Sequence, residues 1–477
     1  MKKLFGTDGM RGEAGRFPLD AQTVRTIGRS LARQLAERAE GVRAPRIIVG
    51  RDTRESGAWI ESAFLEGARA AGAACESAGV ITTPGVAYLA RTLPADAGVV
   101  VSASHNPYED NGIKIFAPTG RKLDDATERL IEADIQQARG DVDSDDGGAQ
   151  RASASNAETA TQSFAGAEAK ESAPDVASVL QARYLDYLAE EVAAGLRLEG
   201  LRLVVDCANG AASHLAPALF ARLGAQVLAV GNAPDGRNIN RECGSLYVER
   251  LGERVVAAGA DLGVAFDGDA DRALFVDGRG AVVDGDATLW VMAKNLLARG
   301  ELAGRRVVAT VMSNIGLELA LGSLGVEMRR ADVGDKYVLE ELLRTGGVLG
   351  GEQSGHIIFP RVSLAGDGMM TTLFLLRAMR EAGESLEALS AGFTRYPQVL
   401  VNVRVAEKRP FQEVAEIEEE ARRTEAALAG QGRLLLRYSG TEPLARVMIE
   451  GPRQDEIERL AQHLAAVIGR ALGDGKK

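Results

Sequence analysis

The chain has 477 residues, too many for a single hydrophobic core, so its length predicts three or four domains. Its 56 basic and 67 acidic residues give a formal net charge of −11, which argues against a nucleic-acid-binding protein. Three scattered cysteines indicate no disulfide framework, and no apolar run is long enough for a signal peptide or a membrane span. We therefore expect a cytoplasmic globular protein without a nucleic-acid or membrane partner.

The first motif is a glycine-rich loop at the N-terminus. Residues 4–12, Leu-Phe-Gly-Thr-Asp-Gly-Met-Arg-Gly, place three glycines around Asp8 and Arg11. Glycines allow backbone amides to approach a ligand, and a guanidinium such as that of Arg11 can bind phosphate through two parallel hydrogen bonds. A flexible loop without a ligand explains the same residues.

One pattern then occurs three times along the chain: a buried strand, a polar loop, a helix and a glycine. The three copies lie at 46–72, 201–224 and 305–325. Repeated units of this kind predict three related α/β domains. Apolar residues at helical spacing within 24–35 predict a further amphipathic helix ahead of the first copy.

Residues 99–107, Val-Val-Val-Ser-Ala-Ser-His-Asn-Pro, are predicted to form a β-branched strand that ends in a tight polar loop. Strand ends of open α/β sheets face the ligand crevice, so Ser102 or Ser104 could meet a substrate there, next to His105. The alternative is that Ser104 and Asn106 only satisfy a turn, which Asn-Pro favours.

Lys114 lies ten residues after Ser104 and follows Asn-Gly at 111–112, a dipeptide typical of a two-residue hairpin turn. We expect strands 99–102 and 113–116 to be joined near this turn. Lys114 would then return towards Ser104 as an acid, a base or a phosphate ligand. A surface lysine on an edge strand is the alternative.

The chain composition changes at two places. Residues 139–178 are acidic or small and polar, with few apolar side chains, and are predicted to be a mobile linker. From about residue 390 the pattern predicts a small α+β domain, with strands at 399–405, 434–437 and 446–450 and helices at 410–428 and 454–472. The predicted division is domain 1 (1–138), the linker, domain 2 (179–282), domain 3 (283–388) and domain 4 (389–477).

Three aspartates alternate in Phe-Asp-Gly-Asp-Ala-Asp-Arg, directly after a buried strand: Asp267, Asp269 and Asp271. In an extended loop their carboxylates can lie on one side, where they repel one another unless a cation binds between them. Ligation by oxygen alone selects Mg²⁺ or Ca²⁺. An EF-hand is excluded because Arg272 stands where that loop needs glycine. A solvated acidic turn is the alternative.

Two later loops carry further polar groups. In Gly-Gly-Glu-Gln-Ser-Gly-His at 350–356, Glu352 and Ser354 could bind adjacent sugar hydroxyls, although the motif taken alone favours a plain glycine-rich turn. In Arg-Tyr-Ser-Gly-Thr-Glu-Pro at 437–443, a guanidinium, two hydroxyls and a glycine amide suit a phosphate dianion, with Arg446 nearby. An ordinary Ser-Gly turn is the alternative. The four histidines show no zinc-like cluster.

Taken in order, Gly-Thr-Asp-Gly-Met-Arg-Gly, Ser-Ala-Ser-His-Asn-Pro, Asp-Gly-Asp-Ala-Asp-Arg and Arg-Tyr-Ser-Gly-Thr-Glu-Pro resemble the motifs of the α-D-phosphohexomutase family, over nearly the whole chain. The loop at 352–356 is similar to the sugar loop of its amino-sugar branch, with Gln353 where relatives tend to carry Met or Glu. The resemblance implies an α/β fold with four domains around a central cleft, three related α/β domains and a smaller C-terminal α+β domain.

The resemblance also implies a role for each motif. Ser104 corresponds to a phosphoserine that donates and re-accepts phosphate, assisted by His105, Lys114 and Arg11. The phosphate on Ser104 would hold Mg²⁺ together with the three aspartates, and Glu352 and Ser354 would recognise the sugar. The phosphate that is not transferred would be bound by Arg437, Ser439, Gly440, Thr441 and Arg446.

The implied reaction converts α-D-glucosamine 6-phosphate into α-D-glucosamine 1-phosphate, in a pathway to UDP-N-acetylglucosamine and the bacterial cell wall. A 1,6-bisphosphate of glucosamine or glucose would be the intermediate or activator. A sugar phosphate is thus the expected partner, bound by a monomer or homodimer. Phosphoryl transfer rests on positioning and charge neutralisation, which these parts provide. The alternatives are a phosphomannomutase/phosphoglucomutase of the same family, a phosphoserine hydrolase and a non-catalytic sugar-phosphate sensor.

Overall fold

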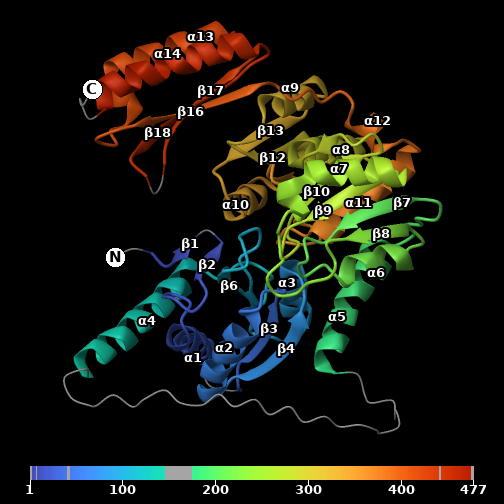
Figure 1. The fold of residues 1–477 in the computed structure, drawn as a ribbon, viewed down its shortest axis with the longest axis vertical. Coiled ribbons are helices and arrows are strands. Elements are labelled where there is room, and N and C mark those ends of the chain that lie inside the picture. The colour runs from blue at the N-terminus through green and yellow to red at the C-terminus, as the bar shows by residue number, and fades with distance from the viewer. Residues whose placement is uncertain (1–2, 7, 40–42, 146–174, 440–441, 474–477) are drawn as a thin grey trace.

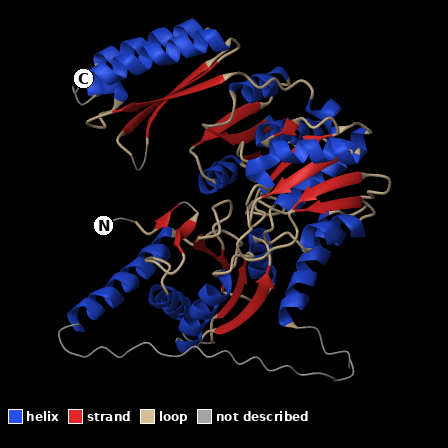
Figure 2. Ribbon diagram, viewed as in Figure 1, coloured by secondary structure: helices blue, strands red, loops and turns tan. Residues whose placement is uncertain are grey.

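The computed structural model describes residues 3–6, 8–39, 43–145, 175–439 and 442–473. It contains four separate sheets with their helices, arranged one after another around the centre of the molecule (Figures 1 and 2). Three of these units are α/β and the last is a smaller α+β unit, as the sequence predicted.

The first unit has a six-stranded sheet in the order β1-β2-β6-β5-β3-β4. Its elements are β1 (Phe5–Gly6), β2 (Gly9–Glu13), α1 (Ala21–Arg38), β3 (Arg46–Arg51), α2 (Gly57–Ala70), β4 (Ala74–Val80), α3 (Thr83–Thr92), β5 (Ala97–Val101), β6 (Asp110–Phe116) and α4 (Asp125–Asp145). Every residue of β5 is buried because helices cover both faces, which explains its unbroken run of apolar residues. The predicted helix within 24–35 is part of α1, and its apolar face packs into the same core as α2 and α4.

The second unit has a five-stranded sheet in the order β11-β10-β9-β7-β8. Its elements are α5 (Val176–Asp186), the π-helix η1 (Tyr187–Val192), β7 (Arg202–Asp206), α6 (Leu215–Arg222), β8 (Gln226–Val230), the 3₁₀-helix η2 (Gly244–Tyr247), α7 (Val248–Ala258), β9 (Leu262–Phe266), β10 (Ala273–Asp277) and β11 (Val282–Val283). Helix α5 packs against β4 of the first unit, so the hydrophobic core continues from the first unit into the second.

The third unit has a four-stranded sheet in the order β13-β12-β14-β15. Its elements are α8 (Gly285–Ala298), the 3₁₀-helix η3 (Ala303–Arg305), β12 (Arg306–Thr310), α9 (Ile315–Ser323), β13 (Glu327–Ala331), α10 (Asp335–Thr345), β14 (Gly350–Gly351), β15 (Ile357–Ile358), α11 (Gly368–Ala382) and α12 (Leu386–Ser390). The predicted boundary between residues 388 and 389 falls inside α12.

The fourth unit is a three-stranded antiparallel sheet in the order β16-β18-β17, covered on one face by two long helices (Figure 2). Its elements are β16 (Gln398–Arg404), the 3₁₀-helix η4 (Phe411–Glu413), α13 (Ala415–Leu428), β17 (Arg433–Tyr438), β18 (Leu444–Glu450) and α14 (Gln454–Leu472). It has its own core, separate from that of the other units.

The predicted threefold repeat is confirmed in the strand pairing. The central strands β3, β7 and β12 each pair in parallel with a strand on either side. One of those neighbours, β5, β9 or β14, then pairs antiparallel with the next strand of the chain. The shared orders are β4-β3-β5-β6, β8-β7-β9-β10 and β13-β12-β14-β15. The three units therefore place the loops before β6, β10 and β15 at equivalent positions.

Two sequence predictions need correction. The Asn-Gly pair at 111–112 does not form a turn but lies inside β6, because the buried side chain of Asn111 donates a hydrogen bond to Ser56 Oγ at 2.8 Å. The chain reverses earlier, in the loop between β5 and β6. The predicted linker also starts too early, since α4 continues to Asp145, and α5 starts before the predicted end. The remainder of that linker, 146–174, lies outside the described residues.

Candidate active site

The three equivalent loops meet at one place. The β5–β6 loop carries Ser104, the β9–β10 loop carries the aspartates, and the β14–β15 loop carries the predicted sugar loop. Ser104 Oγ donates a hydrogen bond to Asp267 Oδ2, which joins the first two loops. His356 Nδ1 lies 3.7 Å from Asp271 Oδ1, which joins the second and third.

The backbone of the serine loop has an unusual conformation at Ser104. Its φ is 52°, in the left-handed region that few residues other than glycine adopt. Ser102 Oγ stabilises this conformation by accepting a hydrogen bond from Ser104 N at 2.9 Å and donating one to Asp52 Oδ2 at 2.6 Å. Ser102 thus shapes the loop, whereas Ser104 presents its hydroxyl to the aspartates.

Two residues outside the predicted motifs hold the carbonyl groups of this loop. Arg54 donates to Ser104 O at 2.9 Å and to Asn106 O at 2.8 Å, and its guanidinium forms a fully buried ion pair with Asp52 at 2.9 Å. Asn240, from the second unit, donates to the same two carbonyls at 2.8 and 3.0 Å. The only sequence signal for Arg54 was its place in the polar loop that follows the first repeated strand. Asn240 gave none.

His105 lies beside the serine hydroxyl, with Nδ1 3.2 Å from Ser104 Oγ. Burial, together with the positive charges of Arg272 and Arg11, lowers the pKa of His105 to about 4. The imidazole is therefore neutral near pH 7, and one of its ring nitrogens can accept a proton or a hydrogen bond.

The three aspartates form a buried cluster in which one carboxylate oxygen from each lies within 4.8 Å of the other two. Among the described residues, Asp269 Oδ1 and Asp271 Oδ1 have no hydrogen-bond partner although both are buried. Burial, with the charges of Asp271 and Asp269, raises the pKa of Asp267 well above its ordinary value. Clustered oxygen ligands with unpartnered buried atoms fit a hard divalent cation such as Mg²⁺.

Lys114 lies within this cluster and not at the protein surface. Strand β6 is flanked by β2 and β5, so the edge-strand alternative is wrong, and the lysine is 1% exposed. Its Nζ lies 2.8 Å from Asp269, 3.1 Å from Asp271 and 3.1 Å from Asp8. Burial by itself would lower the pKa of Lys114, but these three carboxylates raise it well above its ordinary value. The side chain is a cation near pH 7.

The N-terminal loop supplies Asp8 and Arg11, which form an ion pair with each other. Asp8 also pairs with Lys122 at 2.6 Å, and Lys122 reaches Asp335 of the third unit at 2.7 Å. Burial opposes ionisation of Asp8, but Lys114 and Lys122 lower its pKa well below the ordinary value. The loop is therefore tied to the cluster and to the third unit by partly buried charges.

The sugar loop is held by its own polar contacts. Glu352 Oε1 accepts a hydrogen bond from Gly334 N at 3.0 Å, and Ser354 Oγ donates to Glu352 Oε2 at 3.0 Å. The two side chains therefore lie together, as their spacing predicted. Burial alone would lower the pKa of His356, but Asp271 and Asp335 outweigh it and raise the pKa to about 9.

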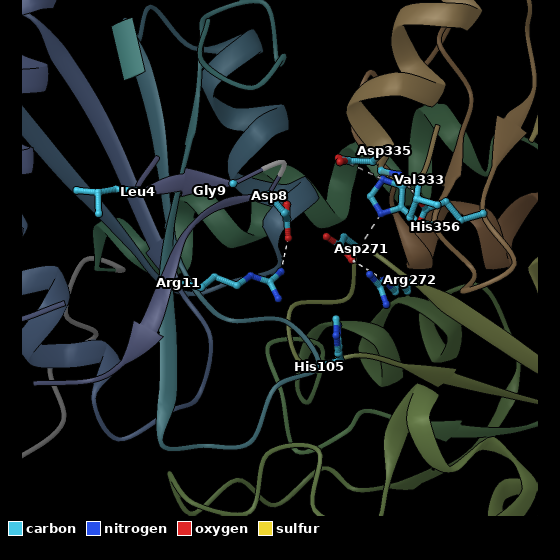
Figure 3. A pocket seen from close by; sticks show the side chains of 13 residues that line it. Leu4, Asp8, Gly9, Arg11, His105, Asp271, Arg272, Val333, Asp335 and His356 are labelled. Atoms are coloured by element: carbon cyan, nitrogen blue, oxygen red, sulfur yellow. Dashed lines mark hydrogen bonds and ion pairs between the residues drawn. The ribbon is translucent and has the colours of Figure 1, made fainter. Parts of the chain in front are cut away.

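Part of this set lines a cavity of about 460 Å³. Figure 3 shows Asp8 and Arg11 on one side and Asp271, Arg272 and His356 on the opposite side. His105 and Glu352 also line it. The first three units thus contribute walls to one charged cavity.

The predicted phosphate-binding residues lie on the β17–β18 hairpin, which extends towards β1 and β2 in Figure 1 and is not part of that cavity lining. Arg437 and Arg446 are directly opposed across the two strands. Burial and the charge of Arg446 lower the pKa of Arg437, because two facing cations repel. Ser439 is buried, while Gly440 and Thr441 lie outside the described residues. The facing guanidiniums favour a bound anion.

The chain belongs to the phosphoglucomutase/phosphomannomutase family, because all four domain types of that family match it in order. Residues 2–140, 182–280 and 284–396 match its alpha/beta/alpha domains I, II and III, and residues 400–467 match its C-terminal domain.

Within this family, the chain is similar to a curated protein named phosphoglucosamine mutase from Solibacter usitatus. The two are 49% identical over 99% of this chain and 100% of the relative. Among solved structures, it is similar to a phosphoglucomutase/phosphomannomutase family protein from Burkholderia thailandensis, with a TM-score of 0.76, 25% identity and coverage of 100% and 98% of the two chains.

The fold is also that of N-acetylphosphoglucosamine mutase from Aspergillus fumigatus, solved in complex with GlcNAc-6P and magnesium. The TM-score is 0.62 with 19% identity, covering 98% of this chain and 96% of that one.

Proposed function

We propose that the chain catalyses the phosphoglucosamine mutase reaction, the interconversion of α-D-glucosamine 6-phosphate and α-D-glucosamine 1-phosphate. The observation that carries the proposal is the position of Ser104, whose hydroxyl contacts the aspartate cluster next to a cavity that also exposes the sugar loop. The name of the Solibacter relative, at 49% identity over the full length, favours glucosamine phosphate over the mannose and glucose phosphates of the alternative.

In the proposed reaction Ser104 carries the phosphate as an ester. A hydroxyl of the bound sugar phosphate attacks phosphorus, the bond from phosphorus to Ser104 Oγ breaks, and the proton of the attacking hydroxyl ends on that oxygen. The product is a 1,6-bisphosphate, which turns end for end in the cavity and returns its other phosphate to Ser104. One serine can thus serve both ends of the sugar.

The surrounding side chains supply what such a transfer requires, namely alignment and charge neutralisation. Lys114 and Arg11 offer positive charge next to the serine loop, and neutral His105 borders Ser104 Oγ. Asp267, Asp269 and Asp271 would hold Mg²⁺ together with the phosphate on Ser104. When bound, such an ion withdraws negative charge from the transferring phosphoryl group.

The remaining residues would bind the substrate at its other end. Glu352 is proposed to accept hydrogen bonds from the sugar hydroxyls, and Ser354 is proposed to donate hydrogen bonds to them. The phosphate that stays on the sugar is proposed to be bound by Arg437, Ser439, Gly440, Thr441 and Arg446. The two facing guanidiniums support this assignment because a phosphate dianion would relieve their repulsion.

The proposal includes the setting of the enzyme. Sugar phosphates carry charges that do not cross a bilayer unaided, so we place the reaction in the cytoplasm, with the enzyme acting as a monomer or homodimer. In the described part of the chain, no helix is both long enough and apolar enough to cross a membrane.

The experiment that tests the function is substitution of the serine. We expect Ser104→Ala to abolish mutase turnover, because no other group at the site can carry the phosphate, and to remove the phosphate detected by intact-mass spectrometry. Ser102→Ala is the matched control: it leaves the acceptor hydroxyl in place, so the phosphate should remain on Ser104 even if the rate falls.

Three outcomes would contradict the proposal. Substantial mutase turnover by Ser104→Ala would remove the phosphoserine mechanism. Steady release of inorganic phosphate by the wild type would indicate a hydrolase. A higher kcat/KM for mannose or glucose phosphate than for glucosamine phosphate would favour the alternative member of the family.

A further inference from the structure

The N-terminus of α8 lies directly against the backbone of the sugar loop. Gly285 N donates a hydrogen bond to Gln353 O at 2.9 Å. A Cβ atom at Gly285 would lie 2.0 Å from Glu352 O, so no side chain fits between helix and loop. The position of the sugar loop is therefore set by the first turn of α8.

Asp286, the next residue of α8, connects that loop to a second element. Its Oδ2 accepts a hydrogen bond from Gln353 Nε2 at 3.2 Å and another from the backbone N of Asn314 at 2.8 Å. The side chain is fully buried, and Oδ1 has no hydrogen-bond partner among the described residues. A single oxygen atom thus holds both the sugar loop and the start of α9.

Asn314 continues the connection into the fourth unit. Its side-chain amide donates to Tyr396 O at 3.0 Å and to Glu450 Oε1 at 3.3 Å, and its Oδ1 accepts from Tyr396 N at 2.9 Å. Tyr396 lies in the segment that leads into β16, and Glu450 is the last residue of β18. Gln398, the first residue of β16, pairs with Glu450, so Asn314 bonds the end of the sheet at which the chain enters the fourth unit.

Glu450 in turn anchors the other strand of the hairpin. It is fully buried and accepts a hydrogen bond from Arg433 Nε of β17 at 2.9 Å, while Arg433 donates to Val311 O of the third unit at 2.7 Å. Strands β17 and β18 also carry Arg437 and Arg446, which lie nearer the hairpin tip. The base of the hairpin is thus fixed to the third unit by hydrogen bonds that are at least partly buried.

A separate contact supports the same junction. Asp284, the N-cap of α8, accepts a hydrogen bond from Ala287 N and lies 2.8 Å from Arg395 of the connecting segment. The first turn of α8 therefore holds that segment through Asp284 as well as through Asp286 and Asn314.

We infer that Asp286 is a positioning residue for the reaction proposed above, and the inference rests on that proposed function. It fixes the position of the sugar loop relative to the base of the phosphate-binding hairpin. The substrate must be held by its hydroxyls and by its non-reacting phosphate at the same time, and a misplacement of about 1 Å can lower a rate about 100-fold. Loss of the hydrogen bonds to Asp286 should therefore affect catalysis without removing any contact to the substrate.

The kinetic test compares Asp286→Ala with Asp286→Asn. We expect Asp286→Ala to lower kcat/KM for glucosamine 6-phosphate by about tenfold, with the larger share in kcat, because alignment and not contact is lost. Asp286→Asn keeps a carbonyl oxygen that can accept both hydrogen bonds and should remain within about twofold of the wild type. Gln353→Ala should also be slower, and Asp286→Ala/Gln353→Ala should be no slower than Asp286→Ala, because both changes break one link.

A second measurement does not depend on activity. Without substrate, amide hydrogen exchange in Asp286→Ala should rise both in the sugar loop, 350–358, and in the strand 398–404 of the fourth unit. In Gln353→Ala it should rise in the sugar loop alone. If Asp286→Ala does not fold, amide exchange in Gln353→Ala still tests the contact between Asp286 and the sugar loop. The kinetics of Asp286→Asn still test whether an oxygen acceptor at this position is sufficient.

Specific results would overturn the inference. These are an Asp286→Ala enzyme within about twofold of the wild type, an Asp286→Asn enzyme as slow as Asp286→Ala, or an exchange increase confined to the sugar loop in Asp286→Ala. Failure of the proposed function would look different: the wild type itself would show no mutase turnover, while the exchange pattern would be unaffected.

Discussion

Replacement of Lys114 by Met should destabilise the metal-free protein more than the protein in Mg²⁺. Lys114 is 1% exposed and lies 2.8, 3.1 and 3.1 Å from carboxylates of Asp269, Asp271 and Asp8. At an effective dielectric constant of about 20, each contact corresponds to roughly 5 kcal/mol of gross Coulomb attraction, much of which is offset by desolvation. Removing one partner of a buried ion pair costs about 3 to 5 kcal/mol, since the remaining charges are uncompensated. We expect a loss of that size in the free energy of unfolding without metal.

The assay is denaturant unfolding of the full chain in a chelator and again in Mg²⁺. Mg²⁺ at 100 times its dissociation constant should stabilise each protein that binds it by about 2.7 kcal/mol. In the variant the cation also replaces the missing positive charge, so the difference in unfolding free energy between variant and wild type should be smaller in Mg²⁺ than in chelator. The matched control is Lys336→Met, whose ion pair with Asp125 has side chains 34% and 45% exposed and should contribute less than about 1 kcal/mol. Equal losses for the two variants in chelator would refute the reasoning.

Three further results are expected. Asp269→Asn should lose most of kcat and its dependence on Mg²⁺ while circular dichroism stays unchanged; unaltered kinetics would remove the aspartates from metal binding. Arg437→Met should raise KM for glucosamine 6-phosphate by at least about tenfold, as expected for a charge-assisted hydrogen bond, whereas exposed Arg453→Met should not. Burial raises the pKa of Asp367 from 3.8 to about 6, so ionisation of this group should lower the unfolding free energy of the wild type by about 2 kcal/mol as pH rises from 4 to 7. Asp367→Asn keeps the acceptor for Met370 N but cannot ionise and should lack this loss; equal pH slopes in denaturant titrations would contradict the assignment.

Sequence reasoning identified the repeated units because each begins with a long apolar strand, followed by polar residues and a helix. That pattern reflects burial on both faces of a parallel sheet, a requirement that is local in the chain and therefore visible in it. The carboxylates of Asp267 and Asp269 were recognised for a similar reason, since their spacing within one loop already limits their chemistry.

Other features depend on distant contacts and could not be predicted. Nothing near Asn240 in the chain shows that it will donate to Ser104 O across two units. The Asn-Gly pair at 111–112 favours a turn locally, but burial of Asn111 against Ser56 outweighs that preference and keeps the pair in a strand. The role of Asp286 was likewise hidden, because its partners lie 28 and 67 residues further along the chain.

The repeat explains how weak motifs combine into one site. Ser104 and Asp267 lie in the loops that precede β6 and β10, and His356 lies just before β15, so equivalent strands of three units direct all three motifs to one centre. Each loop alone is compatible with an ordinary turn. In the structure these loops contact one another directly, Ser104 with Asp267 and Asp271 with His356, as loops of one site would. The fourth unit does not share this topology, so strand order does not position Arg437 and Arg446. The buried hydrogen bonds that run from Asp286 through Asn314 to Glu450 hold the base of their hairpin instead.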